Sequence, residues 1–203
     1  MIERRESLSG HIQFWLACLF LAGWAVVVCG GLALQFLAWE YPCPLALIQR
    51  IFMLLAGLGG GYIVRNAMNG ELEASDYTTG WGLALLGCAA GGFTSWRQTM
   101  LHILPGDPGY GTPVFGLRSY VWALILFVAA IAAIGAVLSV SDRTGAQTIP
   151  AAPHRLVGRA CFALLGVVIA LNVVSVFALE GLHWFLPAEP DRYQLFHDLD
   201  LIG

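Results

Sequence analysis

The amino-acid sequence predicts an all-α integral membrane protein, built as a bundle of about five transmembrane helices. Composition is the first observation: of 203 residues, 58% are hydrophobic and only 11% are charged, whereas a soluble domain carries roughly 25% charged residues. The second observation is a mean hydropathy of +0.73. The third is that the apolar residues gather in stretches of about 20, the length that a helix needs to cross the hydrocarbon core.

We place the five spans at residues 12–37, 44–64, 77–96, 120–141 and 156–186. The first follows two arginines, as the apolar part of a signal peptide does. No charged residue lies between Glu6 and Glu40. This uncharged stretch is far longer than the roughly 7–15 apolar residues of a signal peptide, so we expect the first span to be retained. Residues 187–203 are expected to form an acidic tail outside the membrane.

The second span contains a charge. The uncharged stretch 51–64 would cover only about 21 Å at 1.5 Å per residue, too little to cross. A start at Pro44, a residue tolerated in the first turn of a helix, extends it to about 31 Å and places Arg50 about 9 Å below the helix start. An arginine at that depth costs several kcal/mol unless it has a partner. Arg50 is therefore expected either to bind a ligand or to pair with Glu180, toward the outer end of the fifth span.

The arginines predict the orientation. Lysine is absent, and one side of the five-span arrangement holds Arg4, Arg5, Arg65, Arg143, Arg155 and Arg159. The positive-inside rule puts this side and the N-terminus in the cytoplasm, and the C-terminus in the periplasm. Aromatic residues fall at the expected outer interface: Trp39, Tyr41, Trp96, Tyr120, Trp122 and Trp184. There is no basic run for a phosphate backbone to bind, so nucleic acid is not an expected partner.

Only one of the five cysteines, Cys43, falls in a predicted loop. The other four lie in apolar stretches, where a thiol is usually a small, inert hydrophobic group: Cys18, Cys29, Cys88 and Cys161. No cysteine–histidine spacing typical of a metal site is present, so no metal is expected. His102 and His183 lie near the outer ends of helices and could in principle hold haem iron; nothing else in the sequence favours haem.

Residues 41–50, with the sequence Tyr-Pro-Cys-Pro-Leu-Ala-Leu-Ile-Gln-Arg, resemble the DsbB family of disulfide-bond-formation proteins. These oxidise periplasmic thiol oxidoreductases and pass the electrons to membrane quinone. By this resemblance Cys43 matches the first cysteine of the family's Cys-x-x-Cys pair, and Arg50 matches an arginine that contacts the quinone headgroup. Ala46 stands where the second cysteine of that pair is found.

A second stretch, residues 96–105, is similar to the quinone-proximal segment of the family through its Trp-x-x-Thr-Met-Leu-x-x-x-Pro pattern. Gln98 occupies a position where the family can carry a histidine near the quinone, and His102 lies one helical turn further on. The loop 106–113 is placed like the family's loop that bears a second cysteine pair, but it contains no cysteine. The resemblance covers about residues 12–141.

The resemblance implies a DsbB-like four-helix bundle in the bacterial inner membrane, with a fifth helix added and ubiquinone or menaquinone as the cofactor. The implied site residues are Cys43, as the one candidate thiol, and Arg50, Gln98 and His102 as quinone-binding groups. Each thiol-exchange site needs two sulfurs close together. We therefore expect thiol oxidation by this chain alone to be impaired or lost, with quinone binding retained.

A second hypothesis is that the chain is a non-catalytic subunit that anchors a larger membrane electron-transfer complex. The fifth span and the acidic tail motivate it, because four residues of the tail could form one apolar helical face: Tyr193, Leu195, Phe196 and Leu199. The outer loops and this tail would then contact another membrane or periplasmic protein.

Overall fold

The computed structural model describes residues 2–70, 72–140, 151–183 and 185–200, without the side chains of residues 2–10 and 151–153. Four of the residues used above for orientation thus lie outside the described side chains: Arg4, Arg5, Arg143 and Trp184. Within the described ranges the elements are α1 (Ile2–Leu37), α2 (Pro44–Asn69), α3 (Ala74–Leu101), α4 (Ser119–Val140), α5 (Ala151–Glu180) and the short α6 (Gln194–Asp198).

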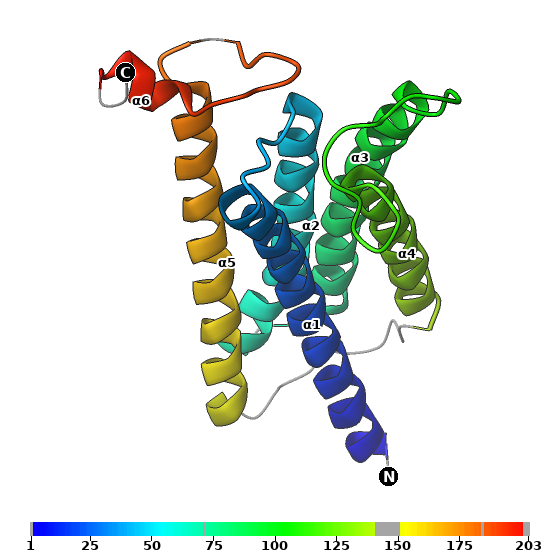
Figure 1. The fold of residues 1–203 in the computed structure, drawn as a ribbon. Coiled ribbons are helices and arrows are strands. Elements are labelled where there is room, and N and C mark those ends of the chain that lie inside the picture. The colour runs from blue at the N-terminus through cyan, green and yellow to red at the C-terminus, as the bar shows by residue number, and fades with distance from the viewer. Residues whose placement is uncertain (1, 71, 141–150, 184, 201–203) are drawn as a thin grey trace.

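The five long helices run side by side, and the N-terminus and the C-terminal segment lie at opposite ends of the bundle (Figure 1). The α1–α2 connection, the α3–α4 loop and the segment after α5 share the end away from the N-terminus (Figure 1). The all-α membrane fold predicted from the sequence is confirmed. This end of the bundle, which we call the loop end, carries the residues singled out above.

Four helices in the described part of the chain are long and apolar enough to cross a membrane: His11–Leu37, Pro44–Asn69, Ser119–Val140 and His154–Glu180. The third long helix, α3, is not in this set, so the expected span over 77–96 is not confirmed. Its composition gives the reason. α3 is rich in glycine, serine and threonine, and it packs between α2 and α4, so much of its surface faces protein.

Capping residues set the bounds of α2 and α3. Proline at the first position of α2 has the backbone φ that a helix needs and lacks an N–H that would have no partner there. The helix ends before Gly70, which takes a left-handed φ of +77°. Glu73 and Asp76 then form a reciprocal capping box that starts α3. The two helices are thereby joined by a short connection and run antiparallel.

Glycines allow α2 and α3 to approach closely. A Cβ atom on Gly59 would lie 2.5 Å from the backbone nitrogen of Ala84, and one on Gly87 would lie 2.8 Å from that of Ala56. Small residues give membrane helices this kind of contact because backbones can meet directly. The close contact holds the start of α2 against the end of α3, where Gln49 bonds to Gln98.

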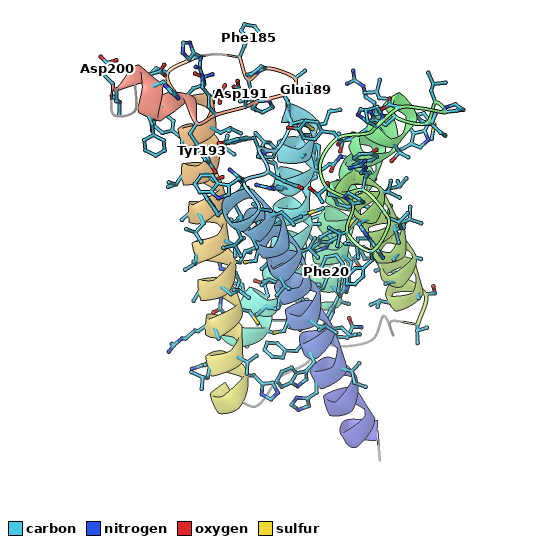
Figure 2. All side chains as sticks on the ribbon, viewed as in Figure 1. Phe20, Phe185, Glu189, Asp191, Tyr193 and Asp200 are labelled. Atoms are coloured by element: carbon cyan, nitrogen blue, oxygen red, sulfur yellow. The ribbon has the colours of Figure 1, made fainter. Side chains whose placement is uncertain are left out.

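Aromatic side chains fill the middle of the bundle. Phe20 of α1, labelled in Figure 2, meets Trp81 of α3 edge to face with ring centroids 5.3 Å apart. Trp24 of α1 lies 4.9 Å from the ring of Phe127 of α4. Phe127 in turn fills the space over Gly91 of α3. These contacts join three helices into one core.

The fifth long helix ends earlier than the expected residue 186. It stops at Glu180 because Gly181 has a left-handed φ of +68°, a conformation that glycine adopts without steric cost. The chain then turns at the loop end of the bundle, reaches toward the end of α2 and returns to form α6 near the end of α5 (Figure 1).

Candidate functional site

Arg50 lies about two turns into α2 and is only 8% exposed. Its Nη1 donates to Oε1 of Gln35 at 2.7 Å, and its Nη2 donates to the carbonyl oxygen of Gly31 at 2.8 Å. Both acceptors belong to α1. A Cβ atom on Gly31 would lie 3.1 Å from Nε of Arg50, so the glycine makes room for the guanidinium against the helix.

The alternative of a salt bridge between Arg50 and Glu180 is wrong for this structure. Among the described residues, the partners of Arg50 are the neutral oxygens on α1, and the two ion pairs join His102 to Asp107 and His183 to Asp198. Hydrogen bonds satisfy part of the guanidinium, but no carboxylate among the described residues forms an ion pair with it. A buried cation held in this way retains the capacity to polarise a neutral acceptor.

The guanidinium borders a cavity of about 240 Å³ at the loop end. Gln49 of α2 and Gln98 of α3 supply further polar groups, and Glu40 and Tyr110 line it from the loops. The apolar lining comes from α1, α2 and α4 and includes Val27, Val28, Leu34, Met53, Trp122 and Leu126. A ligand here would meet the guanidinium, two amides and the carboxylate of Glu40 together with an apolar lining.

Gln98, which is 3% exposed, connects the arginine cavity to the thiol. Its Nε2 lies 3.2 Å from Sγ of Cys43, and its Oε1 accepts a hydrogen bond from Nε2 of Gln49 at 2.8 Å. The amide of Gln98 therefore has partners at both ends. Its position fixes the thiol and the start of α2 relative to α3.

Cys43 is the N-cap residue of α2 and is 7% exposed. It lines a second cavity of about 230 Å³ together with Gln98, His102 and Glu189. Ala46, where the family resemblance places a second cysteine, instead lines the arginine cavity. Of the other cysteines, Cys18 and Cys88 are buried while Cys29 and Cys161 are half-buried.

His102 is not beside the arginine cavity. It ends α3, its Nδ1 lies 3.1 Å from a carboxylate oxygen of Asp107, and its ring centroid lies 5.5 Å from that of Tyr120. Hydrogen bonds from the backbone N–H of Gly109 and from His102 lower the pKa of Asp107. The structure thus brings Arg50, Gln98 and Cys43 together and turns His102 toward the α3–α4 loop.

Tyr110 fastens that loop to the start of the site. Its hydroxyl donates to the backbone carbonyl of Tyr41. Burial, followed by the nearby Cys43, Glu189 and Glu40, raises the pKa of Tyr110 to about 12, so the hydroxyl keeps its proton at neutral pH. Thr112 adds a backbone N–H bond to Oε1 of Glu40 at 2.7 Å. The two loops therefore form one wall.

Sequence reasoning missed Gln35, Gln49 and Tyr193. Gln35 is 1% exposed and accepts directly from the arginine, and Gln49 holds the amide of Gln98. The hydroxyl of Tyr193 accepts from Nε2 of Gln35 at 3.2 Å. One signal was available: a glutamine near the outer end of an uncharged span is expensive in lipid and therefore indicates a polar contact.

Fold and site together define a class: a multi-spanning α-helical membrane protein with a buried arginine above a cavity at one end of the bundle. Residues 13–110 match the model of the family described as "Disulfide bond formation protein DsbB". The match confirms the resemblance of residues 41–50 and 96–105 to this family, and the chain is similar to it over residues 13–110, just under half of its length. No curated protein and no solved structure matches the chain.

The family match and the membrane-spanning helices indicate an inner-membrane protein. The match includes α2, α3, most of α1 and the first part of the α3–α4 loop. It thus contains Arg50, Gln98, Cys43 and His102, whereas α4, α5 and the C-terminal segment lie beyond it.

Proposed function

We propose that this DsbB-like chain binds the headgroup of ubiquinone or menaquinone in the Arg50 cavity, and that thiol oxidation by this chain alone is lost. The observation that carries the proposal is the buried guanidinium, which is held by two neutral acceptors and borders a cavity. Intramembrane ionisable residues usually mark a functional site, and no ion pair with a described residue explains this one.

The donors of the cavity suit a quinone. An arginine has five N–H donors and no acceptor, and two of the five bond to described residues. The remaining three suit a carbonyl oxygen, which can only accept. The cavity of about 240 Å³ is smaller than the roughly 300–1,000 Å³ that drug-sized ligands occupy, so it fits a single ring headgroup whose tail lies among the lipids.

A bound quinone would supply the capacity to accept two electrons, and the chain's own residues bind and orient it. Arg50 would donate hydrogen bonds to a carbonyl of the headgroup, Gln49 and Gln98 would supply further polar groups, and Trp122 and Leu126 of α4 would exclude water. Cys43 has no second sulfur beside it, because Ala46 stands one turn on. Exchange requires a thiolate and a disulfide in contact, so Cys43 could react only with a sulfur supplied by another molecule.

The arrangement in the membrane is part of the proposal. α3, with 28 residues, would extend about 42 Å at 1.5 Å per residue and runs beside α2 and α4 (Figure 1). We propose that it is a fifth span, shielded from lipid by its neighbours. The arginine-rich end then faces the cytoplasm with the N-terminus, and the loop end with the site faces the periplasm.

Quinone extraction tests the function. The protein is purified from membranes as the wild type, as Arg50→Met and as Arg97→Met, and the quinone in each is quantified. Arg97 is an exposed arginine near the end of α3 and serves as the matched control. We expect near-stoichiometric quinone in the wild type and in the control, and its loss in Arg50→Met. Equal quinone in all three folded proteins would refute the site.

A second candidate function is an accessory or anchor subunit of a membrane electron-transfer complex. It is favoured by large apolar side chains beyond the end of α5: Leu182, Phe185 and Leu199 are 67%, 89% and 53% exposed. Replacement of Phe185 and Leu199 by serine should then release a stoichiometric partner subunit from the purified complex. An unchanged subunit composition would count against this candidate.

A further inference from the structure

The C-terminal segment beyond the family match returns to the site. Gly181 turns the chain at the end of α5, and Asp198 fastens the turn by accepting from the backbone N–H of Leu182 at 2.9 Å and contacting Nε2 of His183 at 3.0 Å. Figure 2 shows Tyr193 beside the loop end of α1 and Glu189 over the end of α2. The segment thus covers the helices that carry Gln35 and Arg50.

Tyr193 is held in place by aromatic contacts. Its ring stacks on Phe36 with centroids 6.4 Å apart and an interplanar angle of 9°, and Tyr41 meets it edge to face at 5.3 Å. Phe196 packs on a third side at 6.1 Å. This cluster aims the hydroxyl at Gln35, where it lies 3.2 Å from Nε2.

The hydrogen-bond partners of Gln35 determine how its amide is oriented. A guanidinium has no acceptor, so Oε1 must face Arg50 and Nε2 must face Tyr193, whose hydroxyl accepts. A flipped amide would place its NH₂ group against the guanidinium, donor against donor. Because Gln35 is 1% exposed, bulk water cannot replace the tyrosine as a partner for Nε2, and an unpaired buried amide is costly.

We propose that Tyr193 is a positioning residue for Arg50 and acts through Gln35, so that the C-terminal segment sets the affinity of the site for quinone. This rests on the proposed function. The tyrosine touches neither the cavity nor the ligand; it fixes the amide, the amide fixes Nη1, and the remaining donors of the guanidinium are thereby directed to the cavity.

A double-mutant cycle tests the proposal. Full-length protein is titrated with a short-chain ubiquinone as the wild type, Tyr193→Phe, Gln35→Met and the double variant. Phenylalanine keeps the ring stacking and removes the hydroxyl. We expect Tyr193→Phe to weaken binding about threefold to tenfold, the effect of one lost buried hydrogen bond. In the Gln35→Met background it should have no further effect, because the amide through which it acts is gone.

The infrared carbonyl stretch of the bound quinone gives a readout that a merely structural role would not change. It reports the hydrogen bond from Arg50, and Tyr193→Phe should shift it toward the value of free quinone. Tyr62→Phe, which loses a hydroxyl bonded to Asp76 at the other end of the bundle, is the matched control and should shift neither the stretch nor the affinity. Wild-type affinity in Tyr193→Phe, or an equal loss in both backgrounds, would overturn the proposal.

Arg50→Met distinguishes failure of the quinone site from failure of the positioning role of Tyr193. If Arg50→Met abolishes binding while Tyr193→Phe leaves it unchanged, the quinone site stands and the positioning role falls. If Arg50→Met binds as the wild type does, the proposed function fails and the positioning role fails with it.

Discussion

The Nη1 atom of Arg50 lies 2.7 Å from Oε1 of Gln35, a contact that joins the buried arginine of α2 to a buried amide of α1. A second bond from the same guanidinium, to the carbonyl of Gly31, fixes its plane. An arginine held at two points presents its other donors in a defined direction, which is what a planar carbonyl ligand requires.

Lysine should not replace Arg50. A lysine carries a single ammonium group on a flexible stem and cannot hold two acceptors and a ligand with the planar geometry of a guanidinium. We expect Arg50→Lys to keep the positive charge and the fold but to weaken quinone binding by at least about tenfold, equivalent to one or two lost charge-assisted bonds. Titration with a short-chain ubiquinone measures the affinity of the variant. A wild-type affinity would show that a positive charge alone is enough for quinone binding.

Gly31→Ala should disturb the guanidinium directly. The added Cβ atom would lie 3.1 Å from Nε and 3.3 Å from Nη2 of Arg50, so the side chain must shift. Gly23→Ala, also in α1, is the control, since a Cβ there meets nothing within 4 Å and Gly23 does not line the cavity. We expect weaker quinone binding in the first variant and little change in the second, with equal thermal stability in detergent. The reverse order would contradict the geometry described for α1.

Alanine at Gly87 should destabilise the α2–α3 pair. Its Cβ atom would lie 2.8 Å from the backbone nitrogen of Ala56, and overpacking of this kind costs typically about 1–3 kcal/mol. Gly82→Ala, with open space around the new atom, should be tolerated. Unfolding of the purified protein in detergent gives the comparison, and equal stability of the two variants would argue against direct backbone contact.

The contacts of Asp198 with the turn after α5 should weaken at low pH. The backbone bond from Leu182, with the contact of His183, lowers the pKa of Asp198 below its ordinary value of 3.8. A carboxyl with a lowered pKa contributes stability that is fully present above the unfolded value and is lost as the pH falls through the folded value. Hydrogen exchange in residues 185–200 should therefore be constant from neutral pH down to about 5 and should rise below about 4, after correction for the intrinsic rate. Asp198→Ala should show the faster exchange at every pH, and protection equal to the wild type would contradict this anchor.

The long helices and the buried Arg50 could be predicted from the sequence, because both depend on local signals. Long apolar stretches define spans, and one arginine in such a stretch is conspicuous. Proline at the start of α2 marked that helix's first turn correctly. The end of α5 was missed because Gly181 was read as part of the span rather than as a left-handed cap.

The partners of the arginine could not be predicted for a different reason. Glu180 was a plausible partner by charge, but side-chain contacts depend on the rotation and register of packed helices, which the apolar pattern of α1 does not determine. Gln35 was visible as a polar residue, whereas its contact with Tyr193 required a tail that folds back across α1. His102 likewise does not lie where the sequence predicted, beside the arginine, because it contacts Asp107 in the α3–α4 loop.

The most direct test of the account is an experimental structure of the full chain with ubiquinone bound. We expect a headgroup carbonyl within about 3 Å of a guanidinium nitrogen of Arg50, in the cavity bordered by Gln49, Gln98 and Trp122, with the bond to Gln35 intact. A headgroup bound elsewhere, or an arginine turned to a carboxylate with the cavity filled by lipid, would contradict it.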